Sequence, residues 1–486
     1  MAKQGTPKGT RDFLPKQALQ RKYIFETLED VFRQYAYMPI ETPAMEHTET
    51  LMGKYGDEGD KLLFKLLPRG EKLIKSVKLI QSKIAELMSA EQKGIIEEGS
   101  VNEITSKPNP ILIEALFTNE AEEALRYDLT VPFARFVTEH RNELTFPFKR
   151  YQIQPVWRAD RPQKGRYREF YQCDVDVLGS DALLNEVELL LIVRDVFARL
   201  GLNDVRVRIN NRKLLQGLAE AAGAADKFVP MTVALDKLDK VGWEGVVTEW
   251  RQMGFSDKNI VLIKEVVSLV SGDLDAQTQL LRLEKVKQII NNPNGDKGIQ
   301  ELMFVLNTAA ALGVSQLRID LSLARGLNYY TGAIFEVVHP QFPSSICGGG
   351  RYDDLTGVFG WPGNSGVGIS FGADRICDLL NQLDLFPNEI SRSADVLLAN
   401  MGESEALYSM GIMRAFQEAG LCCMLYPDKV KMKKQFAYAE SLRIPYLAIA
   451  GETEMENKTI TIKNLHSGEQ DTCTIAAAIL KLKAHE

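Results

Sequence analysis

Apolar residues recur at helical spacing near the start of the chain and again before its middle. Over residues 16–34 they fall three or four positions apart, which predicts an amphipathic helix. The segment 39–43 contains two prolines and therefore favours extended backbone after that helix. Residues 183–200 repeat the helical spacing and stop at Gly201, a residue type that often follows a helix.

Alternating apolar and polar residues predict two strands, at residues 150–158 and 168–176. Because successive side chains of a strand point to opposite faces, Arg158 shares a face with Gln152 and Gln154. The corresponding face of the second strand carries Arg168, Phe170, Gln172, Asp174 and Asp176. An antiparallel hairpin would merge these faces into a surface able to hold a phosphate, a purine and a small cation. An ordinary amphipathic hairpin with a solvated polar face fits the strand pattern equally well.

Shorter patterns predict further elements. Residues 125–132 have strand character, with Asp128 and Thr130 on the face opposite Leu129. Strands are also predicted at 317–323 and 333–338, and a strand at 366–372 leads into a helix at 374–383. The glycines of residues 347–353 predict a tight turn.

The chain of 486 residues is long enough for about three domains. Residues 211–316 are rich in Leu, Ala, Lys and Glu at helical spacing, which predicts an inserted helical module. Residues 62–121 combine helical charge patterning with a proline-rich tail and are interpreted as a second insertion. From residue 394 strands alternate with helices, which predicts a small, mostly parallel α/β domain suited to binding.

Composition narrows the classes of function. With 45% hydrophobic and 25% charged residues the chain is typical of soluble globular proteins, and its first residues lack an apolar signal core, so a cytosolic location is expected. A net charge of -7 gives no general attraction to nucleic acid, which would have to meet local basic patches. The six cysteines form no Cys-x-x-Cys pair, so reduced thiols are expected. The basic run at residues 429–434 fits a solvated helix face as well as a nucleic-acid contact.

The sequence contains no Walker loop and no pattern of Ser, His and Asp for nucleophilic catalysis. A nucleotide on this sheet would therefore be held by arginines, whose permanent charge suits phosphoryl and nucleotidyl transfer. Arg158, Arg325 and Arg375 lie beside predicted strands or turns and fit this role. Each of them, taken singly, also fits a salt-bridged surface arginine.

Three segments resemble the signature motifs of class II aminoacyl-tRNA synthetases. Residues 39–43 (PIETP) resemble motif 1, residues 157–170 resemble motif 2, and residues 366–375 (GVGISFGADR) resemble motif 3. Two more segments, residues 323–330 (LARGLNYY) and 348–353 (GGGRYD), are similar to the signatures of the histidyl-tRNA synthetase family. The resemblance extends over nearly the whole chain, and the Arg-Gly-Leu-x-Tyr-Tyr element is its most specific part.

The resemblance implies an α+β fold, in which a class II synthetase-like antiparallel sheet is flanked by helices. The catalytic domain would comprise residues 1–210 and 317–390, with the extra insertion at about 62–121 and the helical domain at 211–316. Residues 394–486 would form an α/β anticodon-binding domain. The implied reaction is ATP-dependent activation of L-histidine to histidyl-adenylate and transfer of the histidyl group to tRNA(His). ATP with Mg²⁺ is the implied co-substrate, a cytoplasmic homodimer is expected, and neither a membrane nor DNA is an expected partner.

The resemblance also implies roles for single residues. Arg158 would hold the α-phosphate and the substrate carboxylate, Arg325 would stabilise charge during attack, and both would be catalytic. Asp176 and Tyr330 would bracket the imidazole. The full implied histidine site is Asp128, Leu129, Thr130, Arg158, Gln172, Asp176, Arg325, Tyr329 and Tyr330. The implied ATP site is Arg158, Asp160, Arg168, Phe170 and Arg375, where Phe170 would stack on adenine. The implied tRNA contacts are Arg161, Lys164, Arg166, Lys429, Lys431, Lys433 and Lys434, and no protein metal ligand is implied.

The chain departs from the family pattern at Asn328, where the family usually has Asp, and in the length of the insertion near residues 62–121. Two rival interpretations remain at this point. One is a histidine-binding regulatory paralogue without catalysis, a class that usually lacks the complete arginine set and the C-terminal domain. The other is a class II synthetase for proline, threonine or glycine, which would lack the Tyr329–Tyr330 pair.

Overall fold

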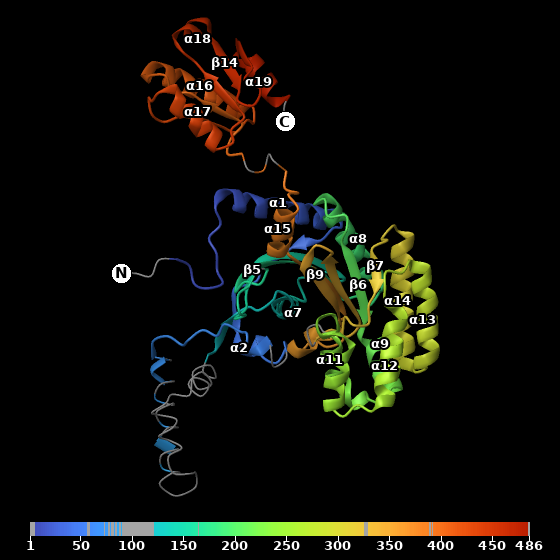
Figure 1. Ribbon diagram of the computed structural model, residues 1–486. Coiled ribbons are helices and arrows are strands. Elements are labelled where there is room, and N and C mark those ends of the chain that lie inside the picture. Colours follow the sequence, from blue (N-terminus) through green and yellow to red (C-terminus); the bar gives the residue numbers. More distant parts are fainter. Residues whose placement is uncertain are drawn as a thin grey trace. The chain divides into compact units, whose positions relative to one another are not determined.

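The computed structural model describes residues 5–55, 59–71, 121–163, 165–324, 329–387 and 392–484, with residues 73–75, 78, 82, 85, 86, 89 and 390 (Figure 1). It divides into two compact units. The first holds Arg21–Leu385 with the N-terminal segment up to Asp12, and the second holds Phe386–Glu486 with Phe13–Gln20. None of the helices in the described part of the chain has the length and apolar character needed to cross a membrane.

An eight-stranded sheet forms the centre of the first unit, in the order β1-β4-β5-β10-β9-β8-β6-β7. Its strands are β1 (Met38–Pro39), β4 (Phe148–Trp157), β5 (Glu169–Leu178), β10 (Gly366–Gly372), β9 (Phe342–Tyr352), β8 (Ala333–His339), β6 (Arg206–Asn211) and β7 (Leu317–Ile319). Only the outermost pairs, β1–β4 and β6–β7, are parallel. The predicted antiparallel sheet flanked by helices is thus confirmed, including the β4–β5 hairpin.

Helices cover the two faces of this sheet differently. On the apolar face, α1 (Pro15–Gln34) and α8 (Leu184–Arg199) place Phe32 and Phe197 against Phe371 of β10, with ring centroids 5.7 and 5.8 Å away. On the other face, α7 (Thr130–Glu139) places Phe133 6.3 Å from Phe148 of β4, measured between ring centroids. The helices α1 and α8 thus pack against one face of the sheet and α7 against the other (Figure 1). The helix α15 (Ala373–Gln382) follows β10 directly, as predicted.

Six α-helices fill the segment between β6 and β7, in agreement with its predicted helical character. They are α9 (Arg212–Ala221), α10 (Phe228–Leu235), α11 (Leu238–Gln252), α12 (Asp257–Val270), α13 (Ala276–Ile290) and α14 (Pro293–Ala311). Polar side chains cap several of them, since Asn211, Ser256 and Asn292 each accept a hydrogen bond from the first turn of the helix that follows. Two short strands, β2 (Met45–His47) and β3 (Glu123–Leu125), form a separate antiparallel pair, and α2 (Thr48–Leu51) follows β2.

The second unit contains a five-stranded sheet in the order β12-β11-β13-β14-β15. The strands β12 (Cys423–Leu425), β11 (Val396–Leu398) and β13 (Tyr446–Ile449) are parallel, as predicted from the alternation of strands and helices. The antiparallel hairpin β14 (Thr459–Asn464) and β15 (Gln470–Thr474) was not predicted, because its strands are short and largely polar. The helices are α16 (Glu403–Glu418), α17 (Met432–Ser441), α18 (Glu452–Asn457) and α19 (Ile475–Lys483).

The strand predicted at residues 125–132 was wrong. The strand β3 ends at Leu125 and the helix α7 begins at Thr130. The Asp128 carboxylate accepts a hydrogen bond from the Val131 backbone N–H, a donor that the first turn of a helix leaves unpaired. Pro132 lies in that first turn, where a proline is tolerated.

The glycine turn predicted at residues 347–353 was also wrong, because these glycines lie inside the strand β9. Their small size serves close packing. A Cβ atom at Gly349 would lie 2.0 Å from the backbone oxygen of Gly368, and one at Gly350 would lie 2.9 Å from the Tyr330 ring. Glycine here allows neighbouring strands and a tyrosine to approach, which no local pattern reveals.

Candidate active site

The polar side chains of β4, β5 and β10 lie on one face of the sheet, here called the polar face. Gln152 opposes Asp174 and Gln154 opposes Gln172 across the β4–β5 pair. On the other side of β5, Ser370 of β10 is the neighbour of Asp174. The merged polar surface predicted from strand periodicity is therefore present.

Asp128 lies where the chain enters α7 and is almost completely buried. Its carboxylate accepts hydrogen bonds from the Tyr55 hydroxyl at 2.9 Å, the Tyr329 hydroxyl at 3.0 Å and the Val131 backbone N–H at 3.2 Å. Burial raises the pKa of Asp128, while the hydrogen bonds from Tyr55 and Val131 act in the opposite direction. These donors fix the orientation of a carboxylate suited to an ammonium group.

Tyr329 and Tyr330 meet edge to face, with ring centroids 5.0 Å apart. Burial raises the pKa of the Tyr330 phenol, and the charges of Asp128 and Asp176 raise it further. The hydroxyl therefore stays protonated at neutral pH and can donate a hydrogen bond. Both carboxylates whose charges act on Tyr330 are buried, Asp128 just before α7 and Asp176 in β5.

Asp174 and Asp176 share one buried arginine. The Arg150 Nη2 atom lies 2.7 Å from Asp176 Oδ2 and 3.8 Å from Asp174 Oδ2, and its guanidinium rests 4.3 Å from the centroid of the Phe133 ring. The Tyr352 hydroxyl donates to Asp176 Oδ1 at 2.8 Å. Burial raises the pKa of Asp174 to about 7, against the opposing effect of Arg150 and with a further rise from Asp176. The single positive charge of Arg150 can thus compensate the negative charge of only one of the two carboxylates.

Three buried acceptors on the polar face have no hydrogen-bond donor among the residues that the structure describes. They are Asp174 Oδ1, Gln172 Oε1 and Asp176 Oδ2, the last of which is ion-paired with Arg150. The amide nitrogen of Gln172 donates to the Ser370 hydroxyl at 2.8 Å, which orients the amide oxygen. Since a buried acceptor without a donor is costly, this part of the polar face is suited to a ligand with N–H groups.

Replacing Asp174 with asparagine should stabilise the protein, and more so at high pH. Because the folded-state pKa of Asp174 is raised to about 7, the folded state loses stability as pH rises from the unfolded-state pKa through that value. We expect Asp174→Asn to gain at least about 1 kcal/mol in free energy of unfolding near pH 8 and less near pH 5, since one pKa unit is worth about 1.4 kcal/mol. Urea denaturation at the two pH values measures this.

Asp273→Asn is the matched control for that experiment. The Asp273 carboxylate is exposed, and the hydrogen bond from Arg318 lowers its pKa, so its removal should not stabilise the protein. A stability gain in Asp174→Asn that is the same at both pH values would contradict the prediction.

Arg158 extends from the end of β4 beside Asp128. Its Nε donates to the backbone oxygen of Tyr127 at 3.1 Å. Its guanidinium carbon lies 4.2 Å from the centroid of the Tyr127 ring and 5.1 Å from that of Phe170. Aromatic rings and a backbone oxygen thus hold the guanidinium in place, and its two terminal amino groups remain suited to a bidentate contact with phosphate or carboxylate.

Arg375, at the start of α15, faces the same region. Its guanidinium donates to the backbone oxygens of Gly165 at 3.0 Å and Ser345 at 2.7 Å. Burial lowers the pKa of Arg375, and the charges of Arg158 and Arg166 lower it further. Mutually repelling guanidinium groups held close together favour the binding of an anion.

The remaining predicted residues are placed as follows. Leu129 is buried and Thr130 half-buried at the start of α7, beside Asp128. Arg168 Nε donates to the backbone oxygen of Asp160 at 3.2 Å within the β4–β5 loop, residues 158–168. Side chains exposed to solvent are Arg161, Arg166, Lys429, Lys431, Lys433 and Lys434. Lys164, Arg325 and Asn328 lie outside the described residues, as does most of the predicted insertion.

Four further residues of this site were given no role from the sequence, although Asp174 was placed on the polar face. Tyr55, Arg150, Asp174 and Tyr352 all contact the predicted carboxylates directly or share their counter-ion. Arg150 and Asp174 could have been found, since strand periodicity places both on the polar face and directly beside residues that were chosen. Tyr55 offered no such signal, because 73 residues separate it from Asp128.

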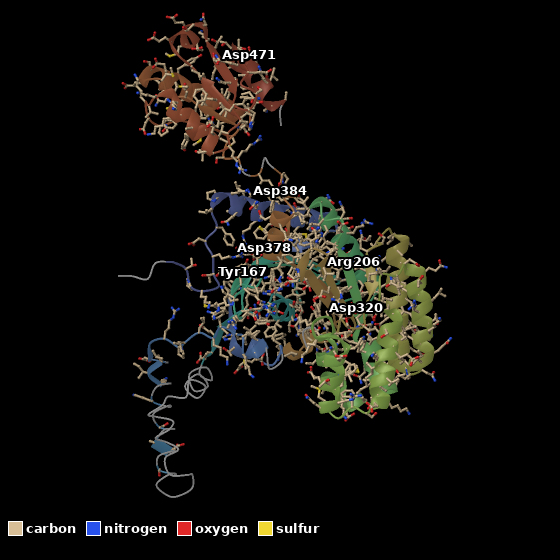
Figure 2. All side chains as sticks on the ribbon, viewed as in Figure 1. Tyr167, Arg206, Asp320, Asp378, Asp384 and Asp471 are labelled. Atoms are coloured by element: carbon tan, nitrogen blue, oxygen red, sulfur yellow. The ribbon has the colours of Figure 1, made fainter. Side chains whose placement is uncertain are left out.

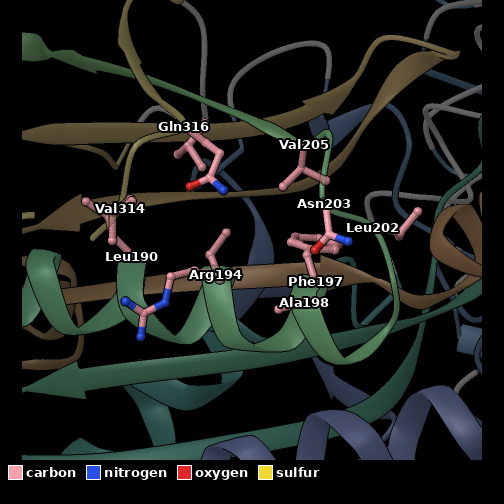
Figure 3. A pocket seen from close by; sticks show the side chains of 11 residues that line it. Leu190, Arg194, Phe197, Ala198, Leu202, Asn203, Val205, Val314 and Gln316 are labelled. Atoms are coloured by element: carbon pink, nitrogen blue, oxygen red, sulfur yellow. The ribbon is translucent and has the colours of Figure 1, made fainter. Parts of the chain in front are cut away.

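The first unit also contains a small pocket of about 40 Å³, partly open to solvent, away from these residues (Figure 3). It lies between α8 and β6, and its walls include Leu190, Phe197 and Val207. Its mainly apolar lining indicates a packing gap rather than a substrate site.

Two family models match the sequence. The model described as histidyl-tRNA synthetase matches residues 9–74 and 119–376, and the model described as anticodon binding domain matches residues 395–485. The chain belongs to the histidyl-tRNA synthetase family. Residues 75–118, between the two stretches that the first model matches, fall within the predicted insertion.

Relatives and solved structures of histidyl-tRNA synthetases agree with this membership. The histidine–tRNA ligase of Phocaeicola vulgatus is 51% identical over 486 residues, covering 99% of this chain and 100% of that protein. That of Bacteroides fragilis strain YCH46 is 51% identical over 476 residues, covering 97% of each. The crystal structure of histidyl-tRNA synthetase from Nostoc sp. PCC 7120 superimposes with a TM-score of 0.80 at 28% identity, covering 100% of both chains. The predicted class II synthetase fold is confirmed.

Proposed function

We propose that this synthetase activates L-histidine with ATP and transfers the histidyl group to the 3' end of tRNA(His). The observation that carries the proposal is the continuity of the site. Buried acceptors for N–H groups, at Asp128, Gln172 and Asp176, adjoin a guanidinium region formed by Arg158 and Arg375. Such a surface matches a cationic amino acid whose carboxylate must meet a nucleotide phosphate.

Histidine would bind with its amino group at the entrance of α7. Asp128 would take the α-ammonium together with Thr130 and the backbone around Leu129, and Gln172 would add its donor-free amide oxygen. The imidazole would lie between Asp176 and the Tyr330 hydroxyl. A side chain without ring N–H groups would leave these buried polar groups unpaired, which disfavours its binding.

ATP would bind along the guanidinium side of the site. Arg158 would bridge the α-phosphate and the histidine carboxylate, Phe170 would stack on the adenine, and Arg375 would lie along the nucleotide. Asp160 and Arg168, joined through the β4–β5 loop, would support this arrangement. In the reaction a carboxylate oxygen bonds to the α-phosphorus while the bond from that phosphorus to pyrophosphate breaks. The arginines, including Arg325, would stabilise the charge that develops.

Mg²⁺ would enter this site with ATP. No cluster of three or more His, Cys, Asp or Glu side chains suited to a metal occurs within the part of the chain described. Because Mg²⁺ readily keeps phosphate oxygens and waters as ligands, the donors available here fit a magnesium ion carried by the nucleotide better than one held in a protein cage. When bound, it would neutralise phosphate charge.

The tRNA would contact both units. The exposed side chains Arg161 and Arg166, with Lys164, would meet the acceptor end, and the basic run of the second unit would meet the anticodon arm. We further propose a cytoplasmic homodimer that associates through the motif 1 segment. Exposed Met38 and Met45 flank that segment, in keeping with an interface.

The alternative, a histidine-binding regulatory paralogue, is less well supported. The chain keeps both Arg158 and Arg375, which form the guanidinium region. Residues 395–485 also match the model of the anticodon binding domain, which such paralogues usually lack. ATP–pyrophosphate exchange measured with each of the twenty amino acids decides between the two. Exchange that depends on histidine supports the synthetase, and histidine binding without exchange supports the paralogue.

Replacing the lysines of the basic run should impair tRNA charging alone. Changing Lys429, Lys431, Lys433 and Lys434 to glutamine should raise the KM for tRNA about tenfold and reduce the salt dependence of that KM. The reason is that binding then makes fewer lysine–phosphate contacts and so releases fewer counter-ions from the tRNA. Histidine-dependent pyrophosphate exchange should not change, since the amino-acid and ATP residues belong to the first unit. Lys483→Gln, an exposed lysine of α19, is the control. Unchanged tRNA charging in the quadruple variant would contradict the assignment.

A further inference from the structure

The N-terminal strap, residues 6–12, runs along the outside of the β4–β5 loop. The Thr10 N–H and hydroxyl both donate to the Pro7 backbone oxygen, at 3.0 and 2.8 Å, which closes a turn. Gly9 lies in this turn with φ +92 and packs tightly, since a Cβ atom there would lie 2.8 Å from both Pro162 and Arg168. The strap therefore has a defined conformation that touches the loop directly.

A backbone hydrogen bond joins the strap to the arginine pair of the loop. The Arg168 N–H donates to the Gly9 backbone oxygen at 2.9 Å, and the Arg158 N–H donates to the Arg168 backbone oxygen at 2.9 Å. Two successive backbone hydrogen bonds thus link Gly9 to Arg168 and Arg168 to Arg158. Displacing the strap would break the hydrogen bond between Arg168 and Gly9, which is next to the one that Arg158 makes to Arg168.

Arg11 fastens the other end of the strap. Its guanidinium carbon lies 3.3 Å from the centroid of the Tyr167 ring, and its Nη2 donates to Asp374 Oδ1 at 2.5 Å. The Tyr167 hydroxyl donates in turn to Asp378 Oδ2 at 3.2 Å on α15, and Figure 2 shows the two side chains near each other. Arg11 therefore contacts both the β4–β5 loop and the helix that carries Arg375.

Asp374 is the common point of these contacts. This buried carboxylate pairs with Arg11 and with Arg21 of α1, and it accepts the Tyr171 backbone N–H of β5 at 3.1 Å. Its neighbour Arg375 donates to the Gly165 backbone oxygen in the same loop. The loop is thus held from two sides, by Arg375 and by the strap.

We propose that Arg11 is a positioning residue for ATP, which acts by holding the β4–β5 loop so that Arg158 and Arg168 are in place before the nucleotide binds. This inference rests on the proposed function for the ATP site. Arg11 touches the loop and α15 rather than the polar face, so its effect should fall on ATP and not on histidine. Binding a nucleotide to a loop that is already ordered avoids the entropy cost of ordering it.

The test compares Arg11→Met with Arg11→Lys and with the control Lys8→Met. The first removes the planar cation, the second keeps a charge for Asp374, and the third removes an exposed charge from the same strap. In pyrophosphate exchange, we expect Arg11→Met to raise the KM for ATP about tenfold with the KM for histidine within about twofold of wild type. Arg11→Lys should recover part of this loss, and Lys8→Met should match wild type.

Hydrogen exchange in the absence of substrates provides a readout that does not depend on the proposed function. Peptides covering residues 159–168 should exchange faster in Arg11→Met than in wild type, and at the wild-type rate in Lys8→Met. Unchanged exchange in Arg11→Met would overturn the proposal, as would equal rises in both KM values together with a lower melting temperature. If wild type shows no histidine-dependent activity, the proposed function fails while the exchange result still decides the role of the strap.

Discussion

Arg158→Ala should lower the rate of histidine-dependent pyrophosphate exchange about a thousandfold, because it removes the guanidinium that would bridge the substrate carboxylate and the α-phosphate. The fold should persist. Arg158 bonds to the chain through one Nε contact to Tyr127 and two ring contacts at the edge of the polar face. Exchange rates and melting temperature, measured on the same preparation, separate a loss of catalysis from a loss of structure.

Arg158→Lys tests the reason for that loss. A lysine keeps the charge but not the planar fork that grips two oxygens at once, so we expect it to recover only a small part of the activity. Arg414→Ala is the control, since Arg414 is an exposed arginine paired with Glu418 on α16. Near-normal exchange in Arg158→Ala would refute the role of this residue.

Gly368→Ala should lower kcat/KM for histidine about a hundredfold or more and affect the KM for ATP much less. A Cβ atom at residue 368 would lie 1.8 Å from Asp176 Oδ1 and 2.3 Å from its Cγ. Asp176 would have to move and lose its contacts with Tyr352 and Arg150. Breaking a buried ion pair costs about 3–5 kcal/mol. Because each 1.4 kcal/mol corresponds to about a tenfold change in kcat/KM, a part of this cost is enough for the expected hundredfold loss.

Gly411→Ala is the matched control for that substitution. Gly411 lies in α16, and a Cβ atom there meets nothing within 4 Å. Alanine should be neutral or slightly stabilising at this position, because it favours helix more than glycine does. Steady-state kinetics for histidine and for ATP measure the effect of Gly368→Ala. If both substrates keep wild-type constants, the Asp176 carboxylate does not define the imidazole site.

Much of the fold could be predicted from local patterns. The β4–β5 hairpin, its polar face and the passage from β10 into α15 follow from strand and helix periodicities, which a few neighbouring residues determine. The same periodicity placed Gln172, Asp174 and Asp176 on one face. Local pattern failed over residues 125–132, where β3 ends at Leu125 and α7 begins at Thr130, with the Asp128 side chain accepting a hydrogen bond from the first turn of the helix.

The charge arrangement of the site could not be predicted, because it depends on residues that are distant along the chain. Tyr55 reaches Asp128 across 73 residues and Tyr352 reaches Asp176 across 176. The pKa of Asp174 is raised by burial and reduced by Arg150, and neither is visible before the strands are paired. The role of the glycines in β9 could not be predicted for the same reason, since the groups that they allow to approach come from other elements.

The amino-acid sequence by itself determined the family, most of the helices and strands, and the residue types expected to face the substrates, because these depend on motifs and on short-range periodicity. Only the tertiary structure decided that Arg150 balances one of two buried carboxylates, and that Arg11 of the strap reaches Asp374 across 363 residues. The physical reason is that electrostatic and packing energies depend on distance in space, and chain folding sets that distance independently of separation in sequence.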